Sequence, residues 1–447
     1  MLLEHQVIAT MDKISSFDDY VWPNRYLLNS IGFWPKESNE SCISRMLTYF
    51  RIILSIFLIS TIFLPEIFTM IKYRHNIAII TGSAPRLFKK VVKHILTSLR
   101  GDGIKSLGFS IKWGKISLLD VGSVAIEMSQ LIFKVYYMLA RREKFYKIYK
   151  SAKELWSITS DHTERRHLEK LAKLANRASI GLFSVGMANL FTFSTVSTVL
   201  TINNYRRSNN TNYVHYFPLN IEYGIIDTQR SSNFGIVLCS QIIAMICSII
   251  GIAGFDSTTM TLILHLSGQF RLVAARFRKL GNIMTLGLLE FQTKVEECIS
   301  HHQKTLRIAN ETRELLAPVI FVQLMSSGLE ICLSIFMLVR GGSNTEVTKY
   351  IIYAVTMFVQ LVLWCLPGEL IMQDSMSVGN VIYHELPWYR LPVSQQKDLF
   401  FVMARARRSC CVTALKFQVM SISKLAEVFN TAASYFALLR SVTDKSV

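Results

Sequence analysis

Residues 421–441, SISKLAEVFNTAASYFALLRS, are the stretch that decides the fold, because they are apolar enough to lie in a membrane. At about 100° per residue, one side of the predicted helix is a stripe of small and polar side chains. These are Asn430, Ser434, Ala437 and Ser441. Contact with lipid does not stabilise such a stripe, because an unpaired polar group in hydrocarbon is costly. The stripe therefore faces either another helix, which small residues most often indicate, or a water-filled lumen.

The composition of the whole chain also indicates a membrane protein. Of its 447 residues, 51% are hydrophobic and only 18% are charged, which is too apolar for an ordinary soluble protein of this length. The formal net charge of +18 is compatible with binding to nucleic acid. The basic residues, however, lie between apolar runs, where a membrane protein uses them to fix its orientation. We therefore expect a lipid bilayer as the partner and no nucleic acid.

The apolar runs predict seven membrane-spanning helices, since each is long enough to cross a bilayer, which takes about 20 residues. Six of them are expected at 46–71, 116–140, 178–202, 232–265, 314–339 and 350–372, and the last is expected to begin near Cys410. Basic or soluble-looking helices extend several spans, at 141–156, 268–280 and 288–313. The predicted organisation is a cytoplasmic N-terminal tail (1–45), six spans with a ligand pocket and cytoplasmic anchoring extensions (46–409), and a last, pore-lining helix with the C-terminus (410–447).

The charges of the linkers predict the orientation. Linkers after the second, fourth and sixth spans are rich in Lys and Arg, whereas those after the third and fifth are not. By the positive-inside rule, the N-terminus is cytoplasmic and the C-terminus extracellular. Segment 72–115 contradicts this orientation, because it is basic and would lie outside. Asn209, in the acceptor sequence Asn209-Asn210-Thr211, supports it, since this predicted glycosylation site then faces the lumen during synthesis.

No catalytic motif or metal-ligand spacing occurs, so we expect neither an enzyme nor a bound metal or cofactor. The pair His301–His302 is interpreted as part of a solvated helix face. Two carboxylates, Asp256 and Glu330, lie within predicted spans, where such a group must find a partner. For Asp256 we favour a structural hydrogen bond to a neighbouring helix, and for Glu330 a structural role and a position in a cavity wall are equally favoured.

Aromatic and methionine side chains in the outer halves of the spans are candidates for the wall of a ligand pocket. Such pockets in helical bundles are mostly apolar and carry few polar groups. The candidates are Met128, Met187, Phe191, Phe193, Tyr350, Tyr353 and Met357, together with Glu330. Each of these residue types is also typical of an ordinary packed core.

Several strings, taken in order, resemble the insect odorant receptor family over most of the chain after about residue 116. Asp256, His265 and Gln269 fall in a D…HL..Q pattern. FVQLMSSGLEICL follows, then Trp388 and Tyr389 in WYRLP, then QKDLFFVMARAR and VTALKF. The chain then reaches SYFALLRSV, which contains Tyr435, Phe436 and Arg440. Leu415 departs from the family pattern, because it stands where the family usually has glycine.

The resemblance implies an all-α, seven-span protein of inverted topology in the plasma membrane of an olfactory neuron, at its dendrite. It implies the odorant-binding subunit of a heteromeric, ligand-gated, non-selective cation channel that detects volatile organic molecules. The implied partner is the insect odorant receptor co-receptor, in a heterotetramer whose last helices line one pore for permeating cations. Matched by position, Leu438 is the candidate hydrophobic gate, with Ser441 just outside it.

Three other classes of membrane protein compete with this interpretation. A gustatory-receptor-type channel would share the fold and the pore, but SYFALLRS and WYRLP argue against it. A G-protein-coupled receptor would need a cytoplasmic C-terminus and an Asp-Arg-Tyr sequence after its third span, which is missing here. A transporter would show repeated halves with broken helices, and the sequence has no internal repeat.

Overall fold

The computed structural model describes residues 16–34, 42–72, 117–159, 162–208, 213–219, 221, 223, 226–283, 288–340, 344–415, 417–431 and 434. Within these residues the regular secondary structure is helical apart from one short hairpin. The helices are α2 (Phe17–Ser30), α3 (Cys42–Lys72), α6 (Ser117–Ala140), α7 (Arg142–Ser157), α8 (His162–Arg207), α9 (Ser231–Ile283), α10 (Leu288–Arg340), α11 (Asn344–Glu385), the 3-10 turn η1 (Trp388–Arg390) and α12 (Val393–Ala406). The hairpin joins β1 (Thr413–Ala414) to β2 (Gln418–Val419), and helical backbone resumes at 422–431.

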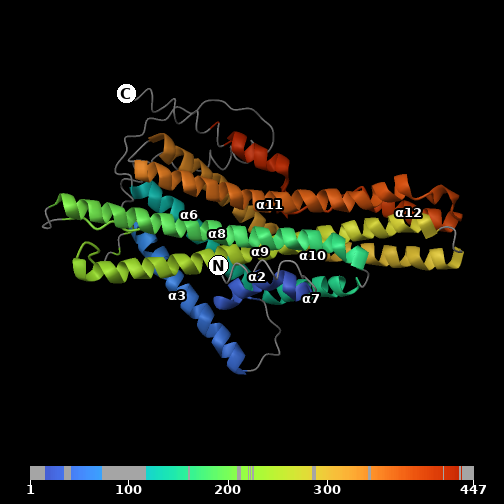
Figure 1. Ribbon diagram of the computed structural model, residues 1–447, viewed down its shortest axis with the longest axis horizontal. Helices are drawn as coiled ribbons and strands as arrows, with labels where there is room; N and C mark the ends of the chain where they lie inside the picture. Colours follow the sequence, from blue (N-terminus) through green and yellow to red (C-terminus); the bar gives the residue numbers. More distant parts are fainter. Residues whose placement is uncertain are drawn as a thin grey trace.

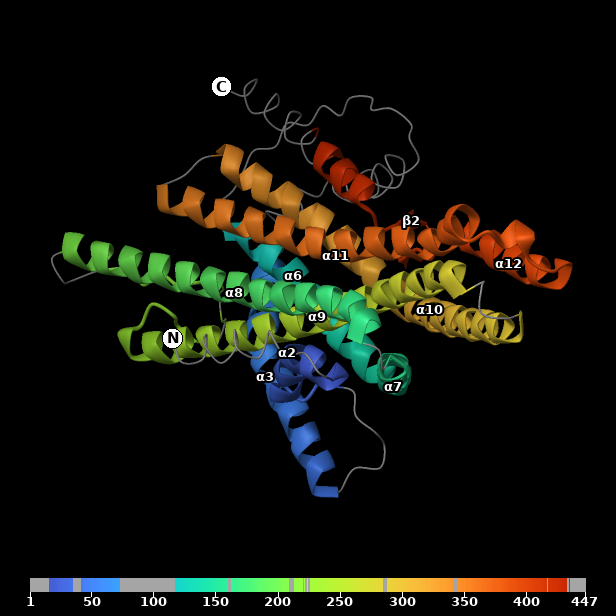
Figure 2. The ribbon, with the colours of Figure 1, turned by 45° about the vertical axis from the view of Figure 1, so that its right-hand side comes forward.

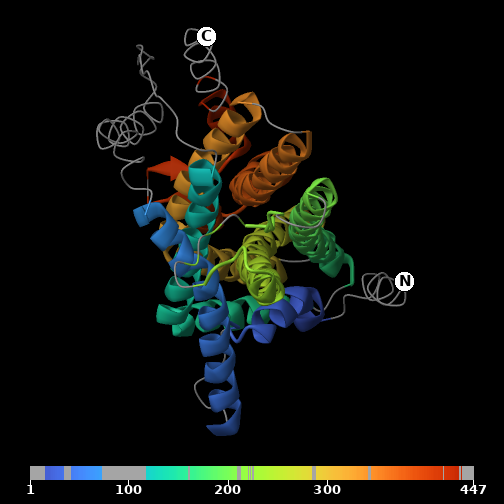
Figure 3. The same cartoon turned by 90° about the vertical axis from the view of Figure 1, so that its left-hand side faces the viewer.

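Four long helices, α8 to α11, run side by side along the long axis of the molecule (Figure 1). Helix α9 is central, because it packs most extensively against α8 and α11 and also contacts α2, α3, α6 and α10. Helix α3 crosses the bundle at a steep angle, and its N-terminal part projects away from the other helices (Figure 2). The view along the bundle shows α8 and α9 on one side and α10 and α11 on another (Figure 3). One hydrophobic core runs through all of these helices.

Among the described residues, five helices are long and apolar enough to cross a membrane: they contain Ser44–Thr69, Glu164–Arg207, Ser231–Gly281, Glu290–Ile335 and Tyr350–Glu385. They correspond to the first, third, fourth, fifth and sixth predicted spans. Helix α6 coincides with the second predicted span, although Glu127 and Lys134 lower its mean hydropathy. Several helices continue well beyond the bilayer as single rods, since α9 and α10 each have 53 residues and would be far longer than a membrane is thick.

The last helix begins later than the predicted start near Cys410, because a hairpin occupies 413–419. The backbone of Leu415, in the turn of this hairpin, has a φ of 46°. A left-handed conformation costs an L-residue with a side chain roughly 1–2 kcal/mol, whereas glycine adopts it freely. This explains why glycine suits the position at which Leu415 departs from the family pattern.

The predicted N-terminal tail contains a helix that packs on the bundle. Helix α2 begins with a capping box, in which the Ser16 hydroxyl accepts a hydrogen bond from the Asp19 amide at 3.1 Å. Its buried Tyr20 donates a hydrogen bond to the Thr261 carbonyl of α9 at 2.8 Å, and Asn24 Nδ2 donates one to Thr261 Oγ1 at 2.8 Å. These contacts make residues 17–30 part of the folded bundle.

The prediction that His301 and His302 form a solvated face is wrong. Both side chains are buried, with 4% and 2% of their surface exposed. The N-terminal half of α10 packs against α9 here, and His301 Nε2 donates to Gln269 Oε1 at 2.9 Å while Arg276 donates to His301 Nδ1 at 3.0 Å. The helix continues the bundle beyond the membrane, so its apolar pattern is interrupted by polar groups that satisfy one another.

Several sequence predictions lie outside the described residues. They concern most of the basic segment 72–115 and the acceptor Asn209. The same holds for the C-terminal candidates Tyr435, Phe436, Ala437, Leu438, Arg440 and Ser441.

Candidate ligand-binding site

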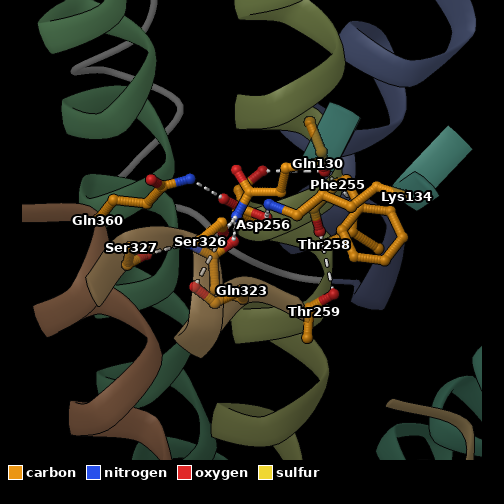
Figure 4. A network of polar contacts seen from close by, with 12 residues as sticks. Gln130, Lys134, Phe255, Asp256, Thr258, Thr259, Gln323, Ser326, Ser327 and Gln360 are labelled. Atoms are coloured by element: carbon orange, nitrogen blue, oxygen red, sulfur yellow. Dashed lines mark hydrogen bonds and ion pairs between the residues drawn. The ribbon is translucent and has the colours of Figure 1, made fainter. Parts of the chain in front are cut away.

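A buried ion pair lies inside the bundle, between α6 and α9. Lys134 Nζ donates to Asp256 Oδ1 at 2.6 Å, and 1% and 3% of the two side chains are exposed. Gln360 of α11 donates its amide to Asp256 Oδ2 at 2.7 Å, so both carboxylate oxygens are satisfied (Figure 4). The Lys134 ammonium also lies over the rings of Phe255 and Trp364, at 5.9 and 5.8 Å from their centroids. Three helices are thus joined through one carboxylate.

A second set of hydrogen bonds joins α6 to α10 beside this ion pair. Gln130 Nε2 donates to Gln323 Oε1 at 2.6 Å and to Ser326 Oγ at 2.8 Å. Gln323 in turn donates to Ser327 Oγ at 2.8 Å (Figure 4). Since interhelical hydrogen bonds hold membrane helices in register, Gln130 and Lys134, one turn apart, fix the position of α6.

A cavity of about 100 Å³ lies next to this polar network, and Gln360 belongs to both. Helices α6, α8, α9 and α11 form its walls, with Leu219 from the loop before α9. Most of the lining is apolar: Val124, Met128, Leu182, Leu190, Phe193, Met245, Ile249, Ile252, Ala253 and Met357. Pockets for drug-sized ligands occupy roughly 300–1,000 Å³, so this cavity fits a small organic molecule.

A few polar groups face the same cavity from different helices. Asn189 of α8 donates to Thr356 Oγ1 of α11 at 2.7 Å, and its Oδ1 has no hydrogen-bond partner among the described residues. The Tyr353 hydroxyl, one turn before Thr356, has none there either. The carboxyl group of Glu127 and the Ser248 hydroxyl complete the polar lining. An apolar cavity with a few convergent polar groups is the usual form of a small-molecule site.

The structure brings four of the eight predicted pocket residues to this cavity: Met128, Phe193, Tyr353 and Met357. Phe191 points away from it, because 73% of its surface is exposed on the outside of α8. Met187 and Tyr350 do not line the cavity. Glu330 is fully buried in α10 outside the lining, and neither of its carboxyl oxygens has a hydrogen-bond partner among the described residues.

Sequence reasoning overlooked the polar groups that matter most here. Lys134 and Glu127 both lie within the predicted span 116–140, and Glu66 lies within 46–71. The rule that singled out Asp256, that an ionisable residue inside a span needs a partner, applies equally to these three. Asn189 carries only a weaker signal, a single amide within an apolar run.

The remaining predicted motif residues lie away from the cavity. His265 and Gln269 are buried in α9, where their side-chain nitrogens are 3.5 Å apart. Trp388 packs against the core, whereas 62% of the Tyr389 surface is exposed. In the last helix, Ser434 donates to the Asn430 carbonyl at 2.8 Å.

Comparison with known proteins gives one consistent family. The family model for the 7tm Odorant receptor matches residues 116–433. Odorant receptor 45a of Drosophila melanogaster is 28% identical over 142 residues, 32% of this chain and 37% of that receptor. Odorant receptor 46a, isoform A, of the same organism is 24% identical over 232 residues, 51% of this chain and 60% of that receptor. The chain thus spans between about a third and three fifths of the length of these curated relatives.

Among solved structures, the insect olfactory receptor OR5 from Machilis hrabei in complex with eugenol superposes on this chain with a TM-score of 0.67. The match covers 95% of this chain and 100% of that one at 15% sequence identity. The long apolar helices define a multi-pass, all-α membrane protein with a mostly apolar cavity inside its bundle. The chain belongs to the 7tm Odorant receptor family of insects, whose fold has seven membrane spans.

Proposed function

We propose that this chain is the odorant-binding subunit of a ligand-gated, non-selective cation channel that assembles with the insect odorant receptor co-receptor. A volatile organic molecule binds the cavity between α6, α8, α9 and α11, and binding favours the open state of a central pore. The observation that carries the proposal is this mostly apolar cavity within a chain of the odorant receptor family. A ligand drives opening only if it binds the open state more tightly than the closed state.

The proposed orientation has the cavity in the extracellular half of the bundle. The basic segments of α7 and α12, and the basic C-terminal part of α9, lie toward the same end of the molecule (Figure 1). By the positive-inside rule, that end faces the cytoplasm. The cavity is lined by the parts of α8, α9 and α11 that lie farther from these basic segments along each helix. Ligand would therefore reach it from outside the cell.

The proposed interface with partner subunits lies at the basic end. Phe400 and Phe401 of α12 have 59% and 70% of their surface exposed, and Val393 and Tyr389 nearby have 66% and 62%. An exposed cluster of large apolar side chains outside the membrane is typical of an interaction site. We propose that these side chains pack against neighbouring subunits of a heterotetramer. They would anchor the extensions of the spans in the cytoplasm.

The last helix is proposed to line the pore, with Leu438 as its gate. Replacing Leu438 with alanine is expected to produce a constitutive leak current, because a smaller side chain widens and wets a hydrophobic constriction. The measurement is whole-cell current without odorant in cells that express the variant with the co-receptor. A matched replacement of Leu439 with alanine is the control, because Leu439 lies about 100° around the helix from Leu438. Equal leak from both variants, or from neither, would contradict the assignment.

The main test of the proposed function is current recorded from cells that express this chain alone or with the co-receptor, against a broad odorant panel. The expected result is odorant-evoked cation current that persists when G-protein signalling is blocked. Responses that require G-protein turnover would overturn the channel proposal. A chain that reaches the surface with the co-receptor and conducts under no condition would overturn it as well.

Filling the cavity is expected to weaken the odorant response. Replacing Met357 with tryptophan adds bulk to a site where 3% of the native side chain is exposed, so ligand loses its space. The half-maximal odorant concentration should rise about tenfold or more, which corresponds to a loss of about 1.4 kcal/mol or more of binding free energy. The control is Ile351→Trp on the same helix, whose side chain is 49% exposed. A wild-type dose–response curve for Met357→Trp, at equal surface expression, would show that ligand binds elsewhere.

A further inference from the structure

Several polar groups of the cavity have no hydrogen-bond partner among the described residues, and each of them can accept a hydrogen bond. Asn189 Oδ1 is buried and unpartnered among the described residues, as is the hydroxyl of Tyr353, a residue with 8% of its surface exposed. The carboxyl group of Glu127 lines the cavity and makes neither a hydrogen bond nor an ion pair with any described residue. Buried polar groups without partners are destabilising, so a ligand that supplies the missing donors is favoured.

Two more carboxyl groups lie behind the cavity wall. Glu66 of α3 and Glu330 of α10 are fully buried, and none of their oxygens has a hydrogen-bond partner in the described part of the chain. Both interact electrostatically with Glu127, and Tyr353 interacts with all three. These groups come from four helices, so the cluster results from the fold rather than from one acidic stretch.

The positive charge nearest to this cluster is already in use. Lys134 interacts electrostatically with Glu127 and Glu330, but its ammonium forms a 2.6 Å ion pair with Asp256. One lysine therefore interacts with three carboxyl groups, those of Asp256, Glu127 and Glu330. Its ion pair is with Asp256, so Glu127 has no ion-pair partner among the described residues, and a cation beside Glu127 would be stabilised in this low-dielectric interior.

We propose that the cavity binds a small primary amine, whose ammonium group pairs with the carboxylate of Glu127. This proposal rests on the proposed function and names the ligand class of the same site. A primary ammonium has three N–H donors, which suit Glu127, Asn189 Oδ1 and the Tyr353 hydroxyl as acceptors. The alkyl chain packs against Met128 and Met357. An inorganic metal ion fits less well, because no metal-binding group of His, Cys, Asp and Glu occurs within the described ranges.

The test compares butylamine with 1-butanol, which have similar size and differ in the group that meets Glu127. In cells that express the full chain with the co-receptor, the half-maximal concentration of butylamine is expected to be at least about tenfold lower than that of 1-butanol. Glu127→Gln should raise the half-maximal butylamine concentration about tenfold or more and leave the 1-butanol response within about twofold, because it removes the charge and keeps the shape. Glu297→Gln, on the exposed face of α10, should change neither response.

The outcomes separate failure of this inference from failure of the proposed function. Responses to alcohols or esters with none to amines would overturn the amine site and leave the channel in place. An unchanged preference for butylamine in Glu127→Gln, or in Tyr353→Phe if the first variant does not reach the surface, would also overturn it. Thermal unfolding of the purified full chain gives a second readout. If butylamine raises the melting temperature but no odorant evokes current through the chain, the channel proposal is overturned and the amine site is supported.

Discussion

Replacing Lys134 with methionine is expected to be the most destabilising single change within the bundle. Methionine keeps the length of the side chain but leaves the carboxylate of Asp256, only 3% exposed, with the Gln360 amide as its remaining partner. Removing one member of a buried ion pair typically costs about 3–5 kcal/mol, because it strands an uncompensated charge. Thermal unfolding of the purified chain and the fraction that reaches the cell surface both measure this loss.

The control for this prediction is the double variant Lys134→Met with Asp256→Leu. Removing both charges should restore most of the lost stability, since replacing a whole buried pair by apolar groups is often neutral or stabilising. Lys294→Met, which breaks the exposed pair with Glu297, should leave the unfolding temperature unchanged. If Lys134→Met unfolds at the wild-type temperature, Asp256 is stabilised by groups other than Lys134. If the double variant is no more stable than the single one, the loss comes from packing against Phe255 and Trp364.

The success of the sequence analysis for the spans has a simple physical cause. A membrane helix must bury about 20 consecutive apolar residues, and this signal is local in the sequence. The predicted span 116–140 coincides with α6 (Ser117–Ala140), and the basic helix expected at 141–156 is α7 (Arg142–Ser157). The predicted continuation of the fourth span into a basic helix is also found, as one unbroken α9.

The sequence was less informative where the fold depends on contacts between distant segments. The hairpin at 413–419 has strands of two residues each, too short for any periodic pattern. Helix α2 has a balanced sequence, and its place in the core depends on Tyr20 and Asn24 meeting α9 about 240 residues later. The polar connector expected at 373–409 contains the end of α11 and all of α12.

The same difference between local and distant signals applies to the cavity. Residue type and depth sufficed to select Met128, Tyr353 and Met357, but Phe191 has the same type and depth and faces outward. The neighbouring helices decide which face of a helix turns inward. The sequence of α8 does not indicate its buried face, because its apolar residues lie all around the helix. The buried ion pair is harder still to predict, since no pattern in a single sequence indicates that Lys134 contacts Asp256.

Replacing Gly368 with alanine is expected to displace the segment that leads into the last helix. A Cβ at this position of α11 would clash with the backbone carbonyl oxygen of Met420, closer than any allowed contact. Backbone cannot rotate away as a side chain can, so we expect a destabilisation near the upper end of the roughly 1–3 kcal/mol typical of overpacked sites. The next residue, Glu369, accepts a hydrogen bond from the Ile422 amide at 3.3 Å, where the last helix begins. The clash therefore acts on the start of the proposed pore helix.

The measurements for Gly368→Ala are the unfolding temperature of the purified chain and the odorant-evoked current at equal surface expression. We expect a lower unfolding temperature and a current reduced about tenfold or more, because α11 carries both the cavity residues Tyr353 and Met357 and the contact with Met420. Gly328→Ala in α10 is the matched control, since its added Cβ meets nothing within 4 Å. That variant should be neutral or slightly stabilising, because alanine is the better helix former. If Gly368→Ala instead responds like Gly328→Ala in both measurements, the hairpin yields freely and ligand binding reaches the pore by a route other than the end of α11.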